Sequence, residues 1–260
     1  MATIDPVLKA FDAAANDRRR GASEIERALV ASLLRCRGKW REANVIRGAG
    51  ILADGQPTMA NLRSLAHRAA DGDLARFEAW LDERSRELAR LEELLAAAAW
   101  PLLEGASGVV TVSRSSAVAA VVEGARGRGW RGTVTVLDGT AAGGGRDLAV
   151  RLRETGAVES LPDAFAAAAL ASPDAVVMTG ADTVGESLFV NATGTRLLLE
   201  LARARGRLTA LVADSGKDVD DAAAFALSER SPMYVDGDRQ WPLFEAVPLT
   251  LVDRRVRESL

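Results

Sequence analysis

The stretch DAVVMTGADTVGESLFVNATGTRLLLELARARGRLTALVAD, residues 174–214, contains a short apolar run, a polar loop, an amphipathic helical segment and a second apolar run. Continuously apolar runs that are separated by a helix predict parallel strands in a sheet covered on both faces. The stretch therefore predicts a strand-helix-strand unit with a right-handed crossover. Asp182 follows the first strand, where it either caps an ordinary turn or faces a ligand.

The same alternation extends upstream to residue 107. Further strands are predicted at 108–112, 133–138 and near 157–160, each followed by a helical pattern, and with 174–180 and 207–214 they make five. The predicted fold class is α/β, with a Rossmann-like, doubly wound parallel sheet over residues 106–260.

Residues 5–103 carry apolar side chains at three- and four-residue spacings, which predicts a helical N-terminal domain over residues 1–105. Ser23 followed by Glu26 has the spacing of a capping box at a helix start. The segment NVIRGAGILADGQPT, residues 44–58, is interpreted as a glycine-rich connection that carries Arg47. The run Arg18-Arg19-Arg20 is interpreted as a solvated helix end.

Composition excludes several classes of function. The 260 residues are 48% hydrophobic and 27% charged, so the chain can bury a substantial core, and a net charge of −3 does not favour a nucleic-acid partner. Cys36 is the only cysteine and His67 the only histidine, which leaves no internal disulfide, no usual zinc site and no triad based on histidine. Acid-base chemistry would fall to carboxylates, lysines, Tyr234 or water.

Neither a cofactor nor a membrane partner is expected. The run Gly143-Gly144-Gly145 lacks the GxGxxG spacing of a dinucleotide site, so no cofactor is predicted. With one cysteine and one histidine, no metal site is predicted either. The N-terminus has no signal-peptide pattern, and the longest apolar stretch is far below the roughly 20 residues that span a bilayer. A soluble cytoplasmic protein is therefore expected.

Polar residues follow the carboxyl ends of the predicted strands, where open parallel sheets bind ligands. The hydroxyls of Ser113, Ser115 and Ser116, with Arg114, open a helix and suit a phosphate; helix capping is the alternative. Loops carrying Arg47, Asp182, Asn191 with Thr195, and Lys217 are expected to meet at the same edge. Such a set suits a phosphorylated sugar or polyol.

Several motifs resemble the superfamily that joins the alpha, beta and delta subunits of translation initiation factor 2B to the aldose-1-phosphate isomerases. The matching segments are, in chain order, IRGAG, GQPTMANL, GGRDLAVRL, VVMTGADTVGESLFVNATGT, ADSGK and LFEAVPLTLVD. In the isomerases this resemblance implies a catalytic cysteine after the first strand and a catalytic aspartate. Asp182 matches the aspartate, and Ser113 stands at the cysteine position.

Other departures concern phosphate binding. Gln56 replaces an arginine of the family pattern, Ala192 replaces a lysine, and Asp138-Gly139-Thr140-Ala141 stands where the family has Glu-Ser-Arg-Pro. The loss of these cations makes a bisphosphate ligand less favoured, because fewer positive side chains are left to bind its phosphates. Serine also cannot act as a low-pKa acid-base group as cysteine can. The resemblance also implies a homodimer through the Rossmann-like domain.

Two hypotheses follow. The first is a divergent isomerase of a small phosphorylated sugar, and the second is a non-catalytic regulatory protein like the initiation-factor subunits, binding a sugar phosphate or nucleotide. The expected catalytic residues are Asp182 and Ser113. The expected substrate-binding residues are Arg47, Gln56, Arg114, Ser115, Ser116, Asn191, Gly194, Thr195 and Lys217.

Overall fold

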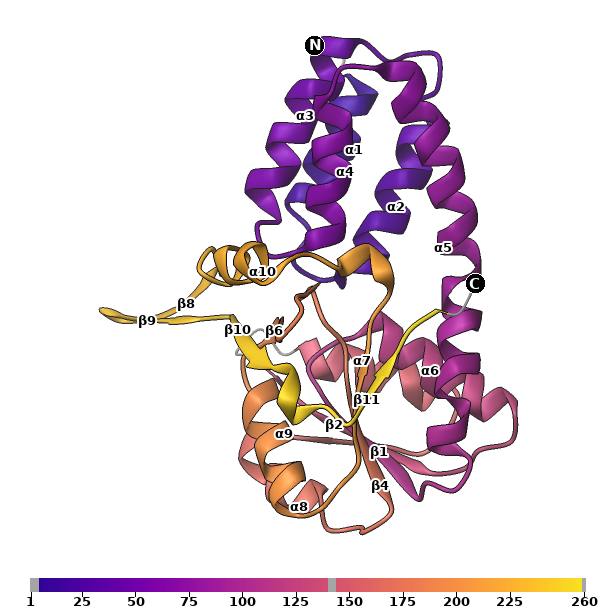
Figure 1. Ribbon diagram of the computed structural model, residues 1–260, viewed down its shortest axis with the longest axis vertical. Helices are drawn as coiled ribbons and strands as arrows, with labels where there is room; N and C mark the ends of the chain where they lie inside the picture. Colours follow the sequence, from indigo (N-terminus) through magenta and orange to yellow (C-terminus); the bar gives the residue numbers. More distant parts are fainter. Residues whose placement is uncertain (1–4, 140–143, 259–260) are drawn as a thin grey trace.

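The first part of the chain is helical, as the periodicity predicts. The computed structural model describes residues 5–139 and 144–258. Its N-terminal helices stack above the sheet in Figure 1: α1 (Pro6–Ala15), α2 (Ala22–Arg35), α3 (Glu42–Gly55), α4 (Ala60–Ala70) and α5 (Leu74–Leu103). The boundary expected at residue 105 falls just after α5 and stays a prediction.

Two local predictions in this region are wrong. Helix α2 is capped by Gly21, whose N–H donates to Glu24 at 3.1 Å, so the capping box is not formed by Ser23 and Glu26, which are both buried. The glycine-rich segment around Arg47 lies inside α3 and is not a loop. Gly48 is accommodated in the helix because α1 packs closely against α3, where Gly48 faces the ring of Phe11.

Substituting Gly48 tests this close approach. A Cβ built at Gly48 would lie 2.1 Å from a ring carbon of Phe11, so Gly48→Ala is expected to lower the free energy of unfolding by roughly 1–3 kcal/mol through overpacking. Gly50→Ala in the same helix is the control, because no atom lies within 4 Å of its Cβ position. Denaturant unfolding should show Gly50→Ala unchanged or stabilised by about 0.5–1 kcal/mol. Equal effects of the two substitutions would contradict this packing.

A six-stranded parallel sheet follows the helices. Its strand order is β11-β7-β4-β1-β2-β3, and every neighbouring pair is parallel. The strands are β1 (Gly108–Val112), β2 (Thr133–Leu137), β3 (Val158–Leu161), β4 (Ala175–Thr179), β7 (Thr209–Val212) and β11 (Arg254–Val256). The five predicted strands are confirmed, and β11 adds a sixth at the edge.

The sheet is covered on both faces, as its apolar strands require. Successive residues alternate between two cores: Val109 packs into one, and Val110 and Val112 into the other. The first core contains α6 (Ser116–Gly127) and α7 (Gly144–Arg153); the second contains residues of α8 (Ala166–Ala169) and α9 (Thr195–Ala204). This confirms the predicted α/β class.

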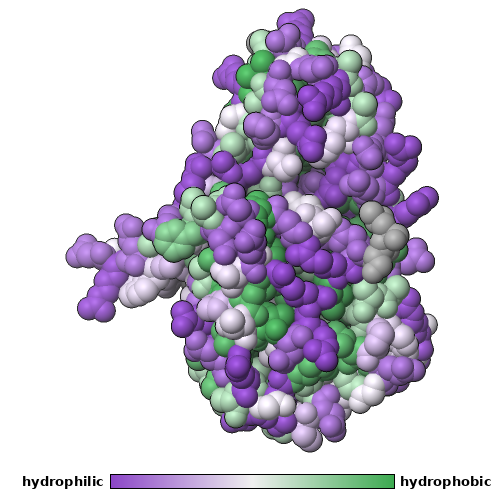
Figure 2. Space-filling model, in the orientation of Figure 1, coloured by the Kyte–Doolittle hydropathy of each residue, from purple (hydrophilic) through white to green (hydrophobic). Residues whose placement is uncertain are grey.

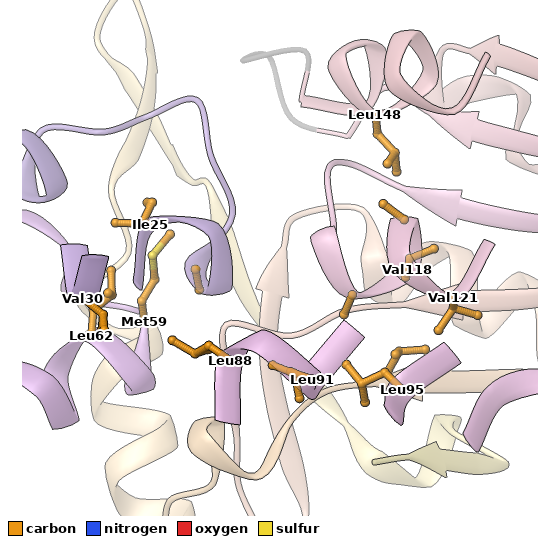
Figure 3. Close-up of a cluster of buried hydrophobic side chains, with 14 of the residues drawn as sticks. Ile25, Val30, Met59, Leu62, Leu88, Leu91, Leu95, Val118, Val121 and Leu148 are labelled. Carbon is orange, nitrogen blue, oxygen red and sulfur yellow. The ribbon is translucent and has the colours of Figure 1, made fainter. Parts of the chain in front are cut away.

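The first core is continuous with the helical region. Figure 3 shows Ile25 of α2, Leu62 of α4 and Leu88 of α5 in the same cluster as Val118 of α6 and Leu148 of α7. Burial of a large aliphatic side chain contributes roughly 1.5–3 kcal/mol. The shared core therefore fixes the helices against the carboxyl end of the sheet, where the candidate site lies.

The segment before α9 that was predicted as a loop forms two antiparallel strands, so that prediction is wrong. β5 (Thr183–Val184) and β6 (Leu188–Ala192) form a small sheet with β10 (Phe244–Pro248). Helix α10 (Asp221–Ser228) and the hairpin β8 (Met233–Asp236) and β9 (Arg239–Pro242) precede β10, and the hairpin projects from the body (Figure 1). One-turn helices lie at Asp163–Phe165, Ser215–Lys217 (η2) and Leu249–Leu251.

Candidate functional site

A cavity of about 420 Å³ lies between the helical region and the carboxyl ends of the strands. The segment after α1, the segment after α3, the carboxyl edge of the sheet and the chain around β10 all contribute to its wall. Its lining residues are Asp17, Arg18, Arg19, Arg20, Gly21, Gln56, Pro57, Thr58, Met59, Ser113, Arg114, Gly144, Asp147, Asp182, Asn191, Ala192, Pro232, Leu243 and Phe244. The predicted glycine loop after β2 includes residues 140–143, which lie outside the described residues.

Asp182 is held in the turn between β4 and β5 by contacts from the helical region. Its carbonyl accepts from Ala60 N at 3.1 Å, and its N–H donates to Val190 O at 2.9 Å. Next to it, the Thr183 hydroxyl donates to Thr58 O at 2.8 Å. Asp182 is 9% exposed as a residue and lines the cavity, so the turn presents a largely buried carboxyl to a ligand there.

The environment of Asp182 favours the protonated carboxyl. Burial raises its pKa to about 6, and the Lys217 ammonium nearby opposes that rise only in part. Near neutral pH, a carboxyl with a pKa in this range is protonated in a small fraction of the molecules. In the other molecules it is a carboxylate that can accept a proton. Both forms required of an acid-base group are therefore accessible.

The raised pKa gives stability a pH dependence. Because the folded protein holds this proton more tightly than the unfolded chain, the cost of burying Asp182 is absent below the usual pKa of 3.8 and is complete above about 6. Asp182→Asn removes the ionisation. The free energy of unfolding of Asp182→Asn minus that of the unsubstituted protein should therefore be larger at pH 7 than at about pH 4, by on the order of 2–3 kcal/mol. Urea unfolding at both pH values measures this difference, and no change between them would contradict the assignment.

Ser113 and Arg114 follow β1 and line the cavity, whereas the next two serines have structural roles. Ser113 has φ = 60°, an uncommon value for a residue with a side chain. The Ser115 hydroxyl caps α6 by accepting from Val118 N at 3.2 Å, which is the capping alternative, and Ser116 is buried at the first turn of that helix. Neither Ser115 nor Ser116 is among the lining residues of the cavity.

The start of α9 is occupied by a carboxylate of the protein. Glu245 on β10 accepts from Gly194 N at 2.8 Å and from Arg196 N at 3.0 Å. Asn191 reaches the cavity, while its amide donates to Thr195 Oγ1 at 3.0 Å and to Thr179 Oγ1 at 2.8 Å. Gly194 and Thr195 therefore build the turn but do not offer a free anion site.

Lys217 lies behind Asp182 and outside the cavity wall. It is buried, and its Nζ donates to Ala181 O at 2.7 Å and lies 3.9 Å from an Asp214 carboxylate oxygen. A side chain held in this way stabilises the turn that carries Asp182. It does not extend to a ligand in the cavity.

The arginine at the cavity differs from the predicted one. Arg47 is exposed on α3 and is not among the lining residues. A second Arg-Gly-Ala triplet, Arg20-Gly21-Ala22, begins α2, and its first two residues line the cavity. The triplet alone could not discriminate between the two copies.

Other lining residues were missed or have a role different from the prediction. Gln56 lines the cavity, but its amide donates to the carbonyls of Ala14 at 2.9 Å and Asp17 at 2.7 Å, so it anchors the end of α1. Arg18 to Arg20 are exposed, as predicted, but they line the cavity. Pro232, Leu243 and Phe244 give it an apolar wall that no local motif indicates.

Comparison with known proteins identifies the family. The model of the Initiation factor 2 subunit family matches residues 19–217, most of the chain. The chain belongs to this family. Its matched region begins at the arginine segment and ends at Lys217, so it contains both the Arg20 triplet and Asp182. Among curated proteins, none matches the chain.

Solved structures of initiation-factor subunits share the fold of this family member. The translation initiation factor eIF-2B of Pyrococcus horikoshii OT3 superposes with a TM-score of 0.82 and 19% identity, covering 98% of this chain and 95% of that one. The tetrameric eIF2B-beta2-delta2 complex from C. thermophilum gives a TM-score of 0.77 and 16% identity, covering 100% of this chain and 93% of that one.

An isomerase structure is similar as well. The 5-methylthioribose 1-phosphate isomerase of Pyrococcus horikoshii OT3 gives a TM-score of 0.70 and 16% identity, covering 96% of this chain and 82% of that one. At these identities the likeness shows the fold. Function is therefore argued from the residues of the site.

Residues 5–139 and 144–258 contain neither a candidate membrane-spanning helix nor a candidate metal site. No helix there is both long and apolar enough to cross a membrane. No group of three or more acidic, cysteine or histidine side chains is arranged there to hold a metal ion.

Proposed function

We propose that the cavity binds a small phosphorylated sugar or polyol and that Asp182 is its acid-base group, as in a divergent aldose-1-phosphate isomerase. The observation that carries this proposal is the position of Asp182: a buried carboxyl with its pKa raised to about 6, in the wall of a 420 Å³ cavity. Perturbed carboxyls at cavity walls are a common feature of catalytic sites.

The charge of the wall supports an anionic ligand. Four arginines, Arg18, Arg19, Arg20 and Arg114, face three aspartates, which leaves the wall net positive. Arg114 pairs with Asp147 at 3.0 Å, and its buried Nε has no hydrogen-bond partner among the described residues. Arg19 is bonded within the described chain only through its backbone nitrogen, which donates to Asp17. These two guanidinium groups retain donors for a phosphate.

Asp182, Ser113 and the apolar wall of the cavity would have different roles in the reaction. The Asp182 carboxyl in its acid form would protonate the ring oxygen as its bond to C1 breaks and the ring opens. Its carboxylate form would then accept the proton of the C2 hydroxyl while the hydrogen on C2 moves to C1 with its electron pair, so that C2 is oxidised to the ketone and C1 is reduced. Ser113, beside the cavity, would hold an oxygen of the substrate by hydrogen bonding. The apolar wall formed by Pro232, Leu243 and Phe244 would exclude water from the reacting atoms.

Turnover can be tested directly. The purified protein is incubated with a panel of aldose 1-phosphates, and ¹³C and ³¹P NMR follow the appearance of ketose phosphates. Formation of a ketose phosphate from at least one member supports the isomerase proposal. Absence of turnover across the panel would reject it.

Binding should depend on the free guanidinium groups. Arg19→Met and Arg114→Met are each expected to weaken affinity for a bound aldose 1-phosphate by roughly 10- to 150-fold, the equivalent of about 1.5–3 kcal/mol for a charge-assisted hydrogen bond. Arg47→Met is the matched control, because Arg47 lies on the exposed face of α3 away from the cavity. Isothermal titration calorimetry provides the affinities. A loss confined to Arg47→Met would overturn this assignment of the phosphate site.

A second candidate function is binding without catalysis, in a regulatory role like that of the initiation-factor subunits. Ser113 and Ala192 favour it, because both line the cavity and neither supplies the thiol or the ammonium that the isomerase pattern has there. This reading predicts ligand-induced thermal stabilisation without turnover. It also predicts assembly through the α/β part of the chain, so a monomer by light scattering under all conditions would count against it.

A further inference from the structure

The helical region and the Asp182 turn are connected by a buried network of charges. Arg84 on α5 donates to both carboxylate oxygens of Glu26 on α2, at 2.7 and 3.0 Å, and to Asp214 Oδ1 at 3.4 Å. The second oxygen of Asp214 accepts from the Ser23 hydroxyl at 3.5 Å and lies 3.9 Å from Lys217 Nζ. All of these residues are buried.

Lys217 connects this network to Asp182. Its Nζ donates to the carbonyl of Ala181, the residue before Asp182, at 2.7 Å. The buried part of the network contains two cations, Arg84 and Lys217, and two anions, Glu26 and Asp214, so the buried charges are balanced before Asp182 ionises. Glu87, a further partner of Arg84, is exposed to solvent. A charge on Asp182 is therefore left without full compensation, in an environment where an isolated buried charge is costly.

We propose that Asp214, held by Arg84 and Ser23 of the helical region, is a positioning residue that neutralises Lys217 and thereby keeps Asp182 able to carry a proton. The inference rests on the proposed acid-base role of Asp182. Asp214 itself contacts no ligand, because it lies outside the cavity wall, behind Lys217. Ser23 on α2 and Arg84 on α5 thereby influence the protonation of the site through Asp214.

Other charged residues line the same cavity as Asp182, and the test leaves them unchanged. They are Asp17, Arg18, Arg19 and Arg20 after α1, Arg114 after β1 and Asp147 on α7. Asp214→Asn removes the anion that Lys217 shares with Arg84. Arg84 retains its pairs with Glu26 and Glu87 in that variant.

The experiment is a ¹³C NMR titration of the Asp182 carboxyl in the ligand-free protein, with the resonance assigned by its loss in Asp182→Asn. In Asp214→Asn the Lys217 charge is no longer offset, so the midpoint is expected to fall by about one pH unit or more. Glu87→Gln is the control: it removes the solvent-facing partner of Arg84 and should leave the midpoint in place. An unchanged or higher midpoint in Asp214→Asn overturns the proposal.

A second variant keeps the test decisive if Asp214→Asn does not fold. Ser23→Ala removes the hydroxyl that shares Asp214 Oδ2 with Lys217, which should strengthen the Asp214–Lys217 pair and raise the Asp182 midpoint. A midpoint that falls or stays in place in Ser23→Ala contradicts the proposal. The titration needs no substrate, so its result stands apart from the isomerase assay: turnover with an unmoved midpoint rejects Asp214 alone, and a moved midpoint without turnover rejects the isomerase alone.

Discussion

Replacing Asp182 by asparagine is expected to lower kcat on any aldose 1-phosphate that the protein isomerises by roughly 10²- to 10⁴-fold, the usual contribution of a positioned acid-base group. The amide keeps the shape of the side chain, so affinity for the sugar phosphate should change far less than kcat. NMR turnover and calorimetric binding on the same preparation measure the two quantities separately.

Asp54→Asn is the control for this substitution. It removes one carboxylate from an exposed side chain on α3 that is not among the lining residues of the cavity, and it should leave kcat and affinity unchanged. Turnover that survives in Asp182→Asn would show that another group moves the proton. Because Asp182→Asn removes the cost of a buried charge near neutral pH, a loss of activity in that variant could not be attributed to unfolding.

The largest effect on stability is expected for Arg84→Met. This change leaves the buried carboxylates of Glu26 and Asp214 without their cation, and breaking a buried ion pair on one side typically costs about 3–5 kcal/mol. Arg84 itself shows the strength of the pairing: burial alone would lower its pKa, yet hydrogen bonds and charge from Glu26 raise it above its usual range. Denaturant unfolding gives the difference in free energy.

Arg27→Met provides a matched comparison. Arg27 is also an arginine of the helical region and pairs with Glu92 at 2.7 Å, but both side chains are about 40% exposed, so the loss should be at most about 1 kcal/mol. In the double variant Glu26→Gln/Arg84→Met, part of the lost stability should return, because one uncompensated anion is removed. Equal costs for Arg84→Met and Arg27→Met would contradict a buried network.

Local patterning was sufficient to predict the parallel sheet. The predicted strand at 108–112 has the same limits as β1, because its residues are apolar on both faces and a helix start follows. β11 was missed because Arg254 and Arg255 are exposed and its sequence has no apolar run. β6 was missed because it pairs with β10, about 50 residues further along the chain, and β5 was missed because it is only two residues long.

The candidate site was harder to predict because long-range packing selects among similar local patterns. Asp182 was found from its position after a strand at the ligand edge of the sheet. The two Arg-Gly-Ala triplets have the same sequence, and only their packing shows which one lies at the cavity. Gly48 packs against Phe11 inside the helical region, whereas Gly21 caps α2 and lines the cavity. Likewise, the glutamate that fills the start of α9 comes from β10, so no motif near Gly194 indicates it.

A crystal structure of the protein soaked with ribose 1-phosphate tests the account most directly. The account predicts the sugar against the Asp182 carboxyl and Ser113, with the phosphate on the guanidinium groups of Arg19 and Arg114. A phosphate bound beside Arg47, or a sugar bound outside this cavity with Asp182 untouched, would contradict it.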